Sequence, residues 1–431
     1  MSRSWDSSRG RHTPRRRRRS LHRRTLGRLA VVLVALAALV AGATAAVAEG
    51  RVGDSLARNI AGAVDRFTPG PAAPAVPEIL TTSPRPGPAA GPREPATAEV
   101  STGRLENVTL TGDDGPVPGA PSPDGRSWTT TAPLEFDTTY RWSGTWVVDE
   151  ETRRPLAEDA FTTVDPEETL EPTVNIRDGA EVGVGAPVAV SFAANLSDEA
   201  KAAVERELSV ETSTPVEGAW AWLPDDADGS RVHYRPKSYW PSGTEVRVHG
   251  ALRGLDLGEA GWVTEDVDRS FAIGTSRIVK ADTQSHQIAV VENGQEIARY
   301  DASYGLDSDP NRVTRSGVHV VMNKAQKVLM TNEAYGYVDE PQFWAVRISN
   351  NGEYIHANPS SSYAQGNSNV SHGCINLSNR DAKEFFAMAT FGDPVEVTGS
   401  SEPLTQRDGD YYDWAIPWDE WTTMSALPPV T

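Results

Sequence analysis

Short runs of alternating apolar and polar residues, broken by turn signals, fill the chain from about residue 100 onward. Residues 108–111 and 139–142 are two such runs, and a Gly-Asp-Asp-Gly turn sequence at 112–115 follows the first. This alternation is typical of half-buried strands in a β-sandwich. With 431 residues the chain is too long for one compact core. We therefore expect a mainly β protein with more than one domain.

A weak internal repeat predicts two immunoglobulin-like β-sandwiches, over residues 100–168 and 169–275. Residues 138–144 of the first correspond to residues 244–250 of the second. The matched strands predict buried core positions at four alternating apolar residues: Tyr140, Trp142, Val246 and Val248. One short helix, capped at Ser197, is expected within the second sandwich.

A third, β-rich domain is expected over residues 276–399. Asn293-Gly294 lies between two strand runs, which is a strong signal for a hairpin. The main helix of this region is predicted to begin at Ser378, directly after the only cysteine of the chain. The tail at 400–431 is rich in Trp and Tyr and too short to fold alone. We expect it to pack back on its own chain, with contact to wall glycan as the alternative.

Three segments with unusual composition precede these domains. Residues 1–28 form a basic head with eleven arginines, residues 29–48 an apolar run, and residues 49–99 a Pro/Ala-rich spacer. The apolar run is just long enough to span a bilayer, and the arginines place the head in the cytoplasm. The run is therefore predicted to be a signal or membrane anchor, either cleaved or retained, with the remaining chain in the cell envelope. The net charge of −18 makes nucleic acid an unexpected partner.

Cys374 is the single cysteine of the chain. Outside the cytoplasm structural cysteines come in pairs, so a lone thiol favours a chemical role over buried packing. A thiol attacks carbonyl groups well only as the thiolate. A helix that begins four residues later and a histidine that forms a thiolate–imidazolium pair would both favour this charged state.

Two histidines are candidates for the base. His356 ends an apolar strand and can approach across a polar loop, whereas His372 lies two residues before Cys374, and spacing alone does not decide between them. The backbone N–H groups of Gly373 and Cys374 could form an oxyanion hole. The same three side chains could instead ligate zinc in a hydrolase, but no acidic residue lies inside the motif to act as a general base.

The sequence Ser-His-Gly-Cys-Ile-Asn at 371–376, with His356 upstream after Tyr-Ile, resembles the signature of the L,D-transpeptidases (YkuD-type catalytic domain). The likeness extends over about residues 276–399 and includes the motif at 314–322. The two sandwiches and the Trp-rich segment at 414–421 resemble the architecture of mycobacterial members of this family.

This resemblance implies an enzyme that cross-links peptidoglycan between the third residues of two stem peptides. Cys374 would attack a tetrapeptide donor, release D-alanine and pass the acyl group to the side-chain amine of a diamino acid in a second stem. His356 matches the base of the family, which the backbone carbonyl of Ala357 would orient. His372 matches a supporting histidine, and Gly373 with Cys374 matches the oxyanion donors.

The resemblance also implies a set of substrate-binding residues: Asn376, Asn351, Gly352, Ser371, and, from a lid segment over residues 330–344, Met330 and Tyr337. It implies no metal and no organic cofactor. Carbapenem β-lactams are expected to acylate Cys374.

Three other functions fit parts of the pattern. An L,D-carboxypeptidase would use the same site with water as the acceptor. A sortase-like wall-protein acyltransferase also uses Cys and His, but its cysteine commonly follows a threonine, and here Gly373 precedes the thiol. A non-catalytic wall-binding protein would not need the intact nucleophile–base pair.

Overall fold

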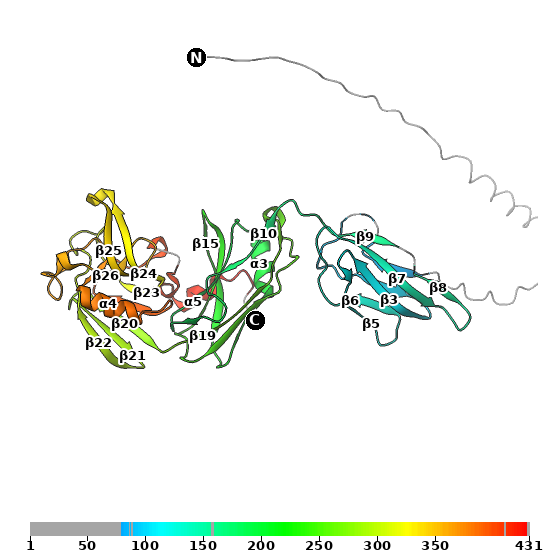
Figure 1. Cartoon of the computed structure of the whole chain (residues 1–431), viewed down its shortest axis with the longest axis horizontal. Helices are drawn as coiled ribbons and strands as arrows, with labels where there is room; N and C mark the ends of the chain where they lie inside the picture. Colours follow the sequence, from blue (N-terminus) through cyan, green and yellow to red (C-terminus); the bar gives the residue numbers. More distant parts are fainter. Residues whose placement is uncertain (1–78, 86, 88, 157–158, 409–410, 429–431) are drawn as a thin grey trace, which may run out of the picture. The chain divides into compact units, whose positions relative to one another are not determined.

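The computed structural model describes residues 79–85, 87, 89–156, 159–408 and 411–428, and most of them lie in short strands (Figure 1). The predicted basic head, the apolar run and most of the spacer lie outside the described residues. Within the described ranges, no helix is both long enough and apolar enough to cross a membrane.

The first sandwich consists of two sheets. In spatial order, one sheet contains β1 (Leu80–Ser83), β2 (Thr97–Val100), β6 (Ser127–Thr130) and β5 (Gly119–Pro121). The other contains β4 (Gly115–Pro116), β3 (Arg104–Gly112), β7 (Thr139–Val147) and β8 (Arg153–Pro155), and β9 (Ala160–Thr162) also pairs with β7.

The first sandwich starts earlier than residue 100, the start expected from the sequence. β1 and β2 pair antiparallel and fall inside the stretch 49–99 that was assigned to the spacer. Ala98 of β2 is fully buried. The expected boundary is corrected here, because a proline-rich composition concealed two strands whose pairing partners are distant in the sequence.

The second sandwich also has two four-stranded sheets. One contains β11 (Thr173–Val174), β13 (Val188–Phe192), β16 (Gly229–Pro236) and β15 (Gly218–Asp226). The other contains β12 (Glu181–Val182), β19 (Val267–Ile273), β17 (Glu245–Gly250) and β14 (Leu208–Thr212), and a separate pair joins β10 (Thr169–Leu170) to β18 (Trp262–Val263).

The core positions predicted from the internal repeat are confirmed. Tyr140 and Trp142 of β7, and Val246 and Val248 of β17, are each no more than 2% exposed. The predicted helix is α3 (Asp198–Glu207), and the Ser197 side chain caps it by accepting a hydrogen bond from the Ala200 backbone N–H.

The third domain, predicted to be catalytic, combines a five-stranded sheet with a four-stranded sheet. The first contains β22 (Gln295–Asp301), β21 (Gln287–Glu292), β20 (Arg277–Asp282), β28 (Pro394–Thr398) and β23 (Gly317–Val320). The second contains β24 (Asn323–Asn332), β25 (Tyr337–Arg347), β26 (Tyr354–Ala357) and β27 (Ile375–Leu377). In Figure 1 the β24–β25 hairpin extends beyond the rest of this domain.

One apolar core joins both sheets of the catalytic domain to α4 (Asn379–Met388). The helix buries Ala382 and Phe385 in this core, and the Ser378 hydroxyl caps its first turn, as predicted. The predicted hairpin turn at Asn293-Gly294 joins β21 to β22, and both residues have the positive φ angles that such two-residue turns require.

The C-terminal tail packs against the second sandwich, which confirms the expectation that it contacts its own chain. Arg235 of β16 is buried beneath three tail tryptophans, with its guanidinium 4.6 Å from the ring centroid of Trp421 and 5.3 Å from that of Trp418. The Trp421 indole N–H donates to the Ala219 carbonyl of β15 over 3.0 Å. These contacts bury the Arg235 guanidinium and the large tryptophan rings together, away from water.

Substitution Trp421→Ala is expected to lower the free energy of unfolding by about 3–5 kcal/mol, because this ring is fully buried. The matched control is Trp418→Ala, which removes a ring over the same guanidinium that is only half-buried and should cost about half as much or less. Denaturant unfolding of the two variants measures the difference, and equal losses would contradict it.

Candidate active site

Two neighbouring parallel strands bring Cys374 and His356 to one surface. β26 pairs in parallel with β27, and the register places Ile355 beside Ile375 and His356 beside Asn376. Ile355 and Ile375 are fully buried in the core of the domain. Because side chains alternate between the two faces of a strand, His356, Asn376 and Cys374 share the opposite face.

That face opens into a pocket of about 400 Å³. Most of the predicted site residues line this pocket: Met330, Tyr337, His356, Ser371, His372, Cys374 and Asn376. The sequence did not predict the other lining residues: Tyr335, Gly336, Glu340, Gln342, Asn358, Ser360, Ser361, Tyr363 and Val370. The predicted residues Gly373, Asn351 and Gly352 are not part of the lining.

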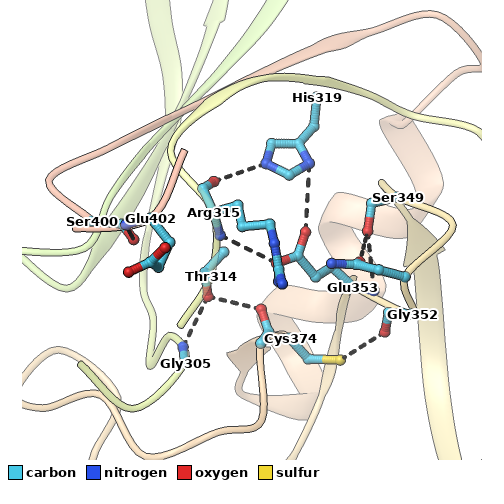
Figure 2. Close-up of polar contacts among 12 residues, drawn as sticks. Gly305, Thr314, Arg315, His319, Ser349, Gly352, Glu353, Cys374, Ser400 and Glu402 are labelled. Atoms are coloured by element: carbon cyan, nitrogen blue, oxygen red, sulfur yellow. Dashed lines mark hydrogen bonds and ion pairs between the residues drawn. The ribbon is translucent and has the colours of Figure 1, made fainter. Parts of the chain in front are cut away.

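The Cys374 thiol is half-buried. Its S–H donates to the Gly352 carbonyl, with 3.5 Å between sulfur and oxygen (Figure 2). Burial raises the pKa of the thiol to about 12, the Tyr354 backbone N–H lowers it, and the Glu353 carboxylate raises it. The direction of this shift is opposite to the one that the sequence pattern favours, because removal from water disfavours the charged form more than the neighbouring donors favour it.

His356 is oriented by a single backbone contact. Its Nδ1–H donates to the Ala357 carbonyl over 3.0 Å, as the resemblance implied. This tautomer leaves Nε2 as an acceptor. Burial lowers the pKa of the imidazole to about 4, although the bond to Ala357 opposes the shift. His356 is therefore neutral at pH 7 and able to accept a proton.

His372 belongs to the exposed side of the pocket and packs against the tip of the β24–β25 hairpin. Its ring centroid is 4.5 Å from that of Tyr335 and 5.5 Å from that of Tyr337. Burial, and then the charge of Arg312, lower its pKa. Among the described residues, no hydrogen bond joins the Cys374 thiol to either imidazole.

The Gly373 backbone N–H is already engaged. It donates to the Ser371 hydroxyl over 3.1 Å, and that hydroxyl donates to the Cys374 carbonyl. Gly373 has a φ angle of +118°, which L side chains rarely adopt. Gly373 therefore forms the turn before Cys374, and its N–H is not open as the predicted oxyanion donor.

Side chains from a distant segment hold the loop before the cysteine by its carbonyl groups. Arg312 donates to the Val370 carbonyl over 2.6 Å and to the Ser371 carbonyl over 3.1 Å. The Thr314 hydroxyl donates to the Gly373 carbonyl over 2.7 Å. Neither residue was assigned a role from the sequence, although Thr314 begins a motif that carried the family resemblance.

Two predicted substrate-binding residues differ in their surroundings. Asn376 is 2% exposed, lines the pocket, and has a side-chain oxygen with no hydrogen-bond partner. Asn351 is exposed, and its side-chain oxygen accepts from the Ser349 hydroxyl. Asn376 is thus available to a ligand in the pocket, whereas Asn351 is directed elsewhere. Within the described ranges, no group of three or more His, Cys, Asp or Glu side chains is arranged to hold a metal ion.

Alkylation of Cys374 by iodoacetamide is expected to accelerate about tenfold per pH unit between about pH 7 and about pH 10, because the thiolate fraction stays small below a pKa of about 12. An unperturbed thiol, with a pKa of about 8.5, would level off within this range. Intact mass against time measures the rate, with Cys374→Ala as the blank. A rate already constant between about pH 5 and about pH 8 would instead indicate an ion pair with an imidazole.

Comparison with known proteins gives consistent matches. The family model for the bacterial Ig domain matches residues 89–256, and that for the L,D-transpeptidase catalytic domain matches residues 276–397. L,D-transpeptidase 5 of Mycobacterium tuberculosis is 45% identical over 78% of this chain and 74% of the relative, and L,D-transpeptidase 2 of the same species is 33% identical over 77% and 81%. A solved structure of LD transpeptidase LdtMt1 in complex with imipenem is 33% identical over 52% of this chain and 97% of that chain, with a TM-score of 0.44. By its extensive identity to two such relatives, this chain belongs to the L,D-transpeptidase family and is a transpeptidase.

Proposed function

We propose that this L,D-transpeptidase joins peptidoglycan stem peptides with Cys374 as the nucleophile and His356 as the base. The observation that carries the proposal is the parallel pairing of β26 with β27, which directs both side chains into one pocket. The sortase-like and non-catalytic alternatives receive no support from the family matches.

Acylation begins from a neutral pair. The pKa values of about 12 for the thiol and about 4 for the imidazole support proton transfer to His356 Nε2 as the sulfur attacks, rather than before. The attacked carbonyl belongs to the third residue of a tetrapeptide donor. Its bond to D-alanine breaks, His356 returns the proton to the leaving amine, and the donor remains as a thioester on Cys374.

In the second step, the acyl group is transferred from Cys374 to a second stem peptide. The neutral side-chain amine of a diamino acid attacks the thioester, and His356 accepts the proton released from nitrogen. The carbon–sulfur bond breaks and the proton passes to the sulfur, which restores the thiol. The product is a cross-link between the third residues of the two stems. Water in place of the amine would give a tripeptide, the product of a carboxypeptidase.

The remaining pocket residues are proposed to bind the donor. The Cys374 backbone N–H, turned by Gly373, is the proposed oxyanion donor, because the Gly373 N–H is held by Ser371. The unpartnered Asn376 oxygen is suited to accept from a peptide N–H. Met330, Ser371 and Tyr337 line the same pocket, whereas Asn351 and Gly352 lie outside it and are not proposed as substrate contacts.

This substrate places the enzyme in the cell envelope, outside the cytoplasm. The apolar run at 29–48 is the proposed route across the membrane, as an anchor or as a cleaved signal. The acidic net charge supports the absence of nucleic acid among the partners.

Incubation of the full chain with a disaccharide tetrapeptide is expected to give a cross-linked dimer and free D-alanine, measured by mass spectrometry. Cys374→Ala is the control and should give neither product. Exclusive formation of tripeptide would identify a carboxypeptidase, and dimer formation by Cys374→Ala would overturn the role of the thiol.

Imipenem is expected to acylate Cys374, and His356→Ala should slow this acylation by about 10²–10⁴-fold, the usual contribution of a general base. His372→Ala should slow it much less, because His372 packs on the lid tyrosines and makes no hydrogen bond to the thiol. Intact mass against time gives both rates. Equal rates for the two variants would refute His356 as the base.

A further inference from the structure

A buried carboxylate lies behind the nucleophile and takes no part in the chemistry proposed above. Glu353 is 2% exposed and directly precedes β26. It does not line the pocket. Figure 2 shows its carboxylate between Arg315 and His319. Burial of a charged side chain costs free energy unless partner groups compensate it. The partners of Glu353 therefore indicate its role.

Those partners come from one segment that precedes and enters β23. The Arg315 backbone N–H donates to Glu353 Oε1 over 3.2 Å, and the Arg315 guanidinium lies 3.5 Å from the same oxygen. His319 is fully buried, with Nδ1 3.7 Å from the other carboxylate oxygen. Its Nε2–H donates to the Arg315 carbonyl over 2.9 Å. His319 Nδ1 thus lies close to the Glu353 carboxylate, although 3.7 Å is too long for a hydrogen bond.

The peptide groups on either side of Glu353 are those that contact the nucleophile. The preceding carbonyl, of Gly352, accepts the Cys374 S–H. The following N–H, of Tyr354, faces the sulfur and favours its anion. In addition, a Cβ on Gly373 would lie 3.5 Å from Glu353 Cγ, so the side chain packs beneath the turn that precedes the cysteine.

The same distant segment fixes that turn from a second point. Thr314, next to Arg315, donates to the Gly373 carbonyl and accepts from the Gly305 backbone N–H over 2.8 Å (Figure 2). Residues 314–319 thus hold both the Glu353 carboxylate and the loop that carries the cysteine. Displacement of either by about 1 Å would spoil the alignment of sulfur and base, which can cost about 10²-fold in rate.

We propose that Glu353 is a positioning residue for the nucleophile: its carboxylate, held by Arg315 and His319, fixes the two peptide groups that orient the Cys374 sulfur. This role rests on the proposed function of Cys374 as the attacking group.

The test compares Glu353→Leu, which removes the charge and the acceptor, with the nearly isosteric Glu353→Gln. The matched control is Asp393→Asn, because Asp393 is another buried carboxylate of the same domain, paired with Arg277 at 3.5 Å and outside the pocket. Imipenem acylation of Cys374 is measured as a maximal rate and a half-saturating concentration. Thermal unfolding of each variant reports the loss of stability.

Glu353→Leu is expected to lower the maximal acylation rate by about tenfold or more, with the half-saturating concentration within about twofold of the parent chain. Glu353→Gln should retain part of the rate, and Asp393→Asn should retain nearly all of it. An unchanged maximal rate in folded Glu353→Leu, or an equal loss in Asp393→Asn, would overturn the proposal. If Glu353→Leu does not fold, the maximal acylation rate of Glu353→Gln alone tests the proposal, and an unchanged rate in that variant would overturn it.

Alkylation by iodoacetamide at fixed pH separates this proposal from the proposed function, because it needs no substrate site. The Glu353 charge raises the pKa of the thiol, so without it the thiolate should form more readily and alkylation should become severalfold faster. A slower acylation together with a faster alkylation is not expected from general loss of structure. If the parent chain forms no imipenem adduct, the proposed function fails, and an alkylation rate unchanged in both Glu353 variants would overturn the positioning role separately.

Discussion

The parallel pairing of β26 with β27 is the constraint on which the rest of the site depends. Burial of Ile355 and Ile375 fixes which face of the two strands packs into the core. Because side chains alternate along a strand, His356 and Cys374 then lie on the opposite face, over the pocket. Parallel neighbours need a long connection, and the polar loop between the two residues supplies it. The proposed catalytic pair is thus placed by core packing, and its placement does not depend on contact between thiol and imidazole.

This placement explains why both groups rest in their neutral forms. The strand ends that position Cys374 and His356 also remove them from water, which disfavours thiolate and imidazolium alike. A neutral thiol is less susceptible to oxidation than a thiolate, a useful property for a lone cysteine outside the cytoplasm. In the proposed mechanism, reactivity arises when a bound carbonyl allows attack and proton transfer together, so accurate orientation of the sulfur matters more than its charge at rest.

Features set by neighbours in the sequence could be predicted, and those set by distant partners could not. The Asn293-Gly294 turn, the Ser378 cap and the cluster around Cys374 each reside in a few consecutive residues. The upward shift in the pKa of Cys374 could not be predicted, because a short motif does not show how far burial raises the pKa of a thiol. The roles of Arg312 and Glu353 were missed because their partners lie tens of residues away, where only the folded pairing of strands brings them together.

The two sides of the pocket are held by different kinds of contact, and this affects how each tolerates sequence change. At the back, Arg312 and Thr314 bind carbonyl groups of residues 370–373, so their bonds depend on the path of the chain more than on its side chains. At the front, Tyr335 and Tyr337 of the hairpin region contact the His372 ring directly. A side-chain change at Tyr335 or Tyr337 alters the surface of the pocket itself. The path of residues 370–373, by contrast, is kept as long as Arg312 and Thr314 still donate to their carbonyl groups. The loop before Cys374 and the pocket surface around His372 are therefore supported by separate parts of the same domain.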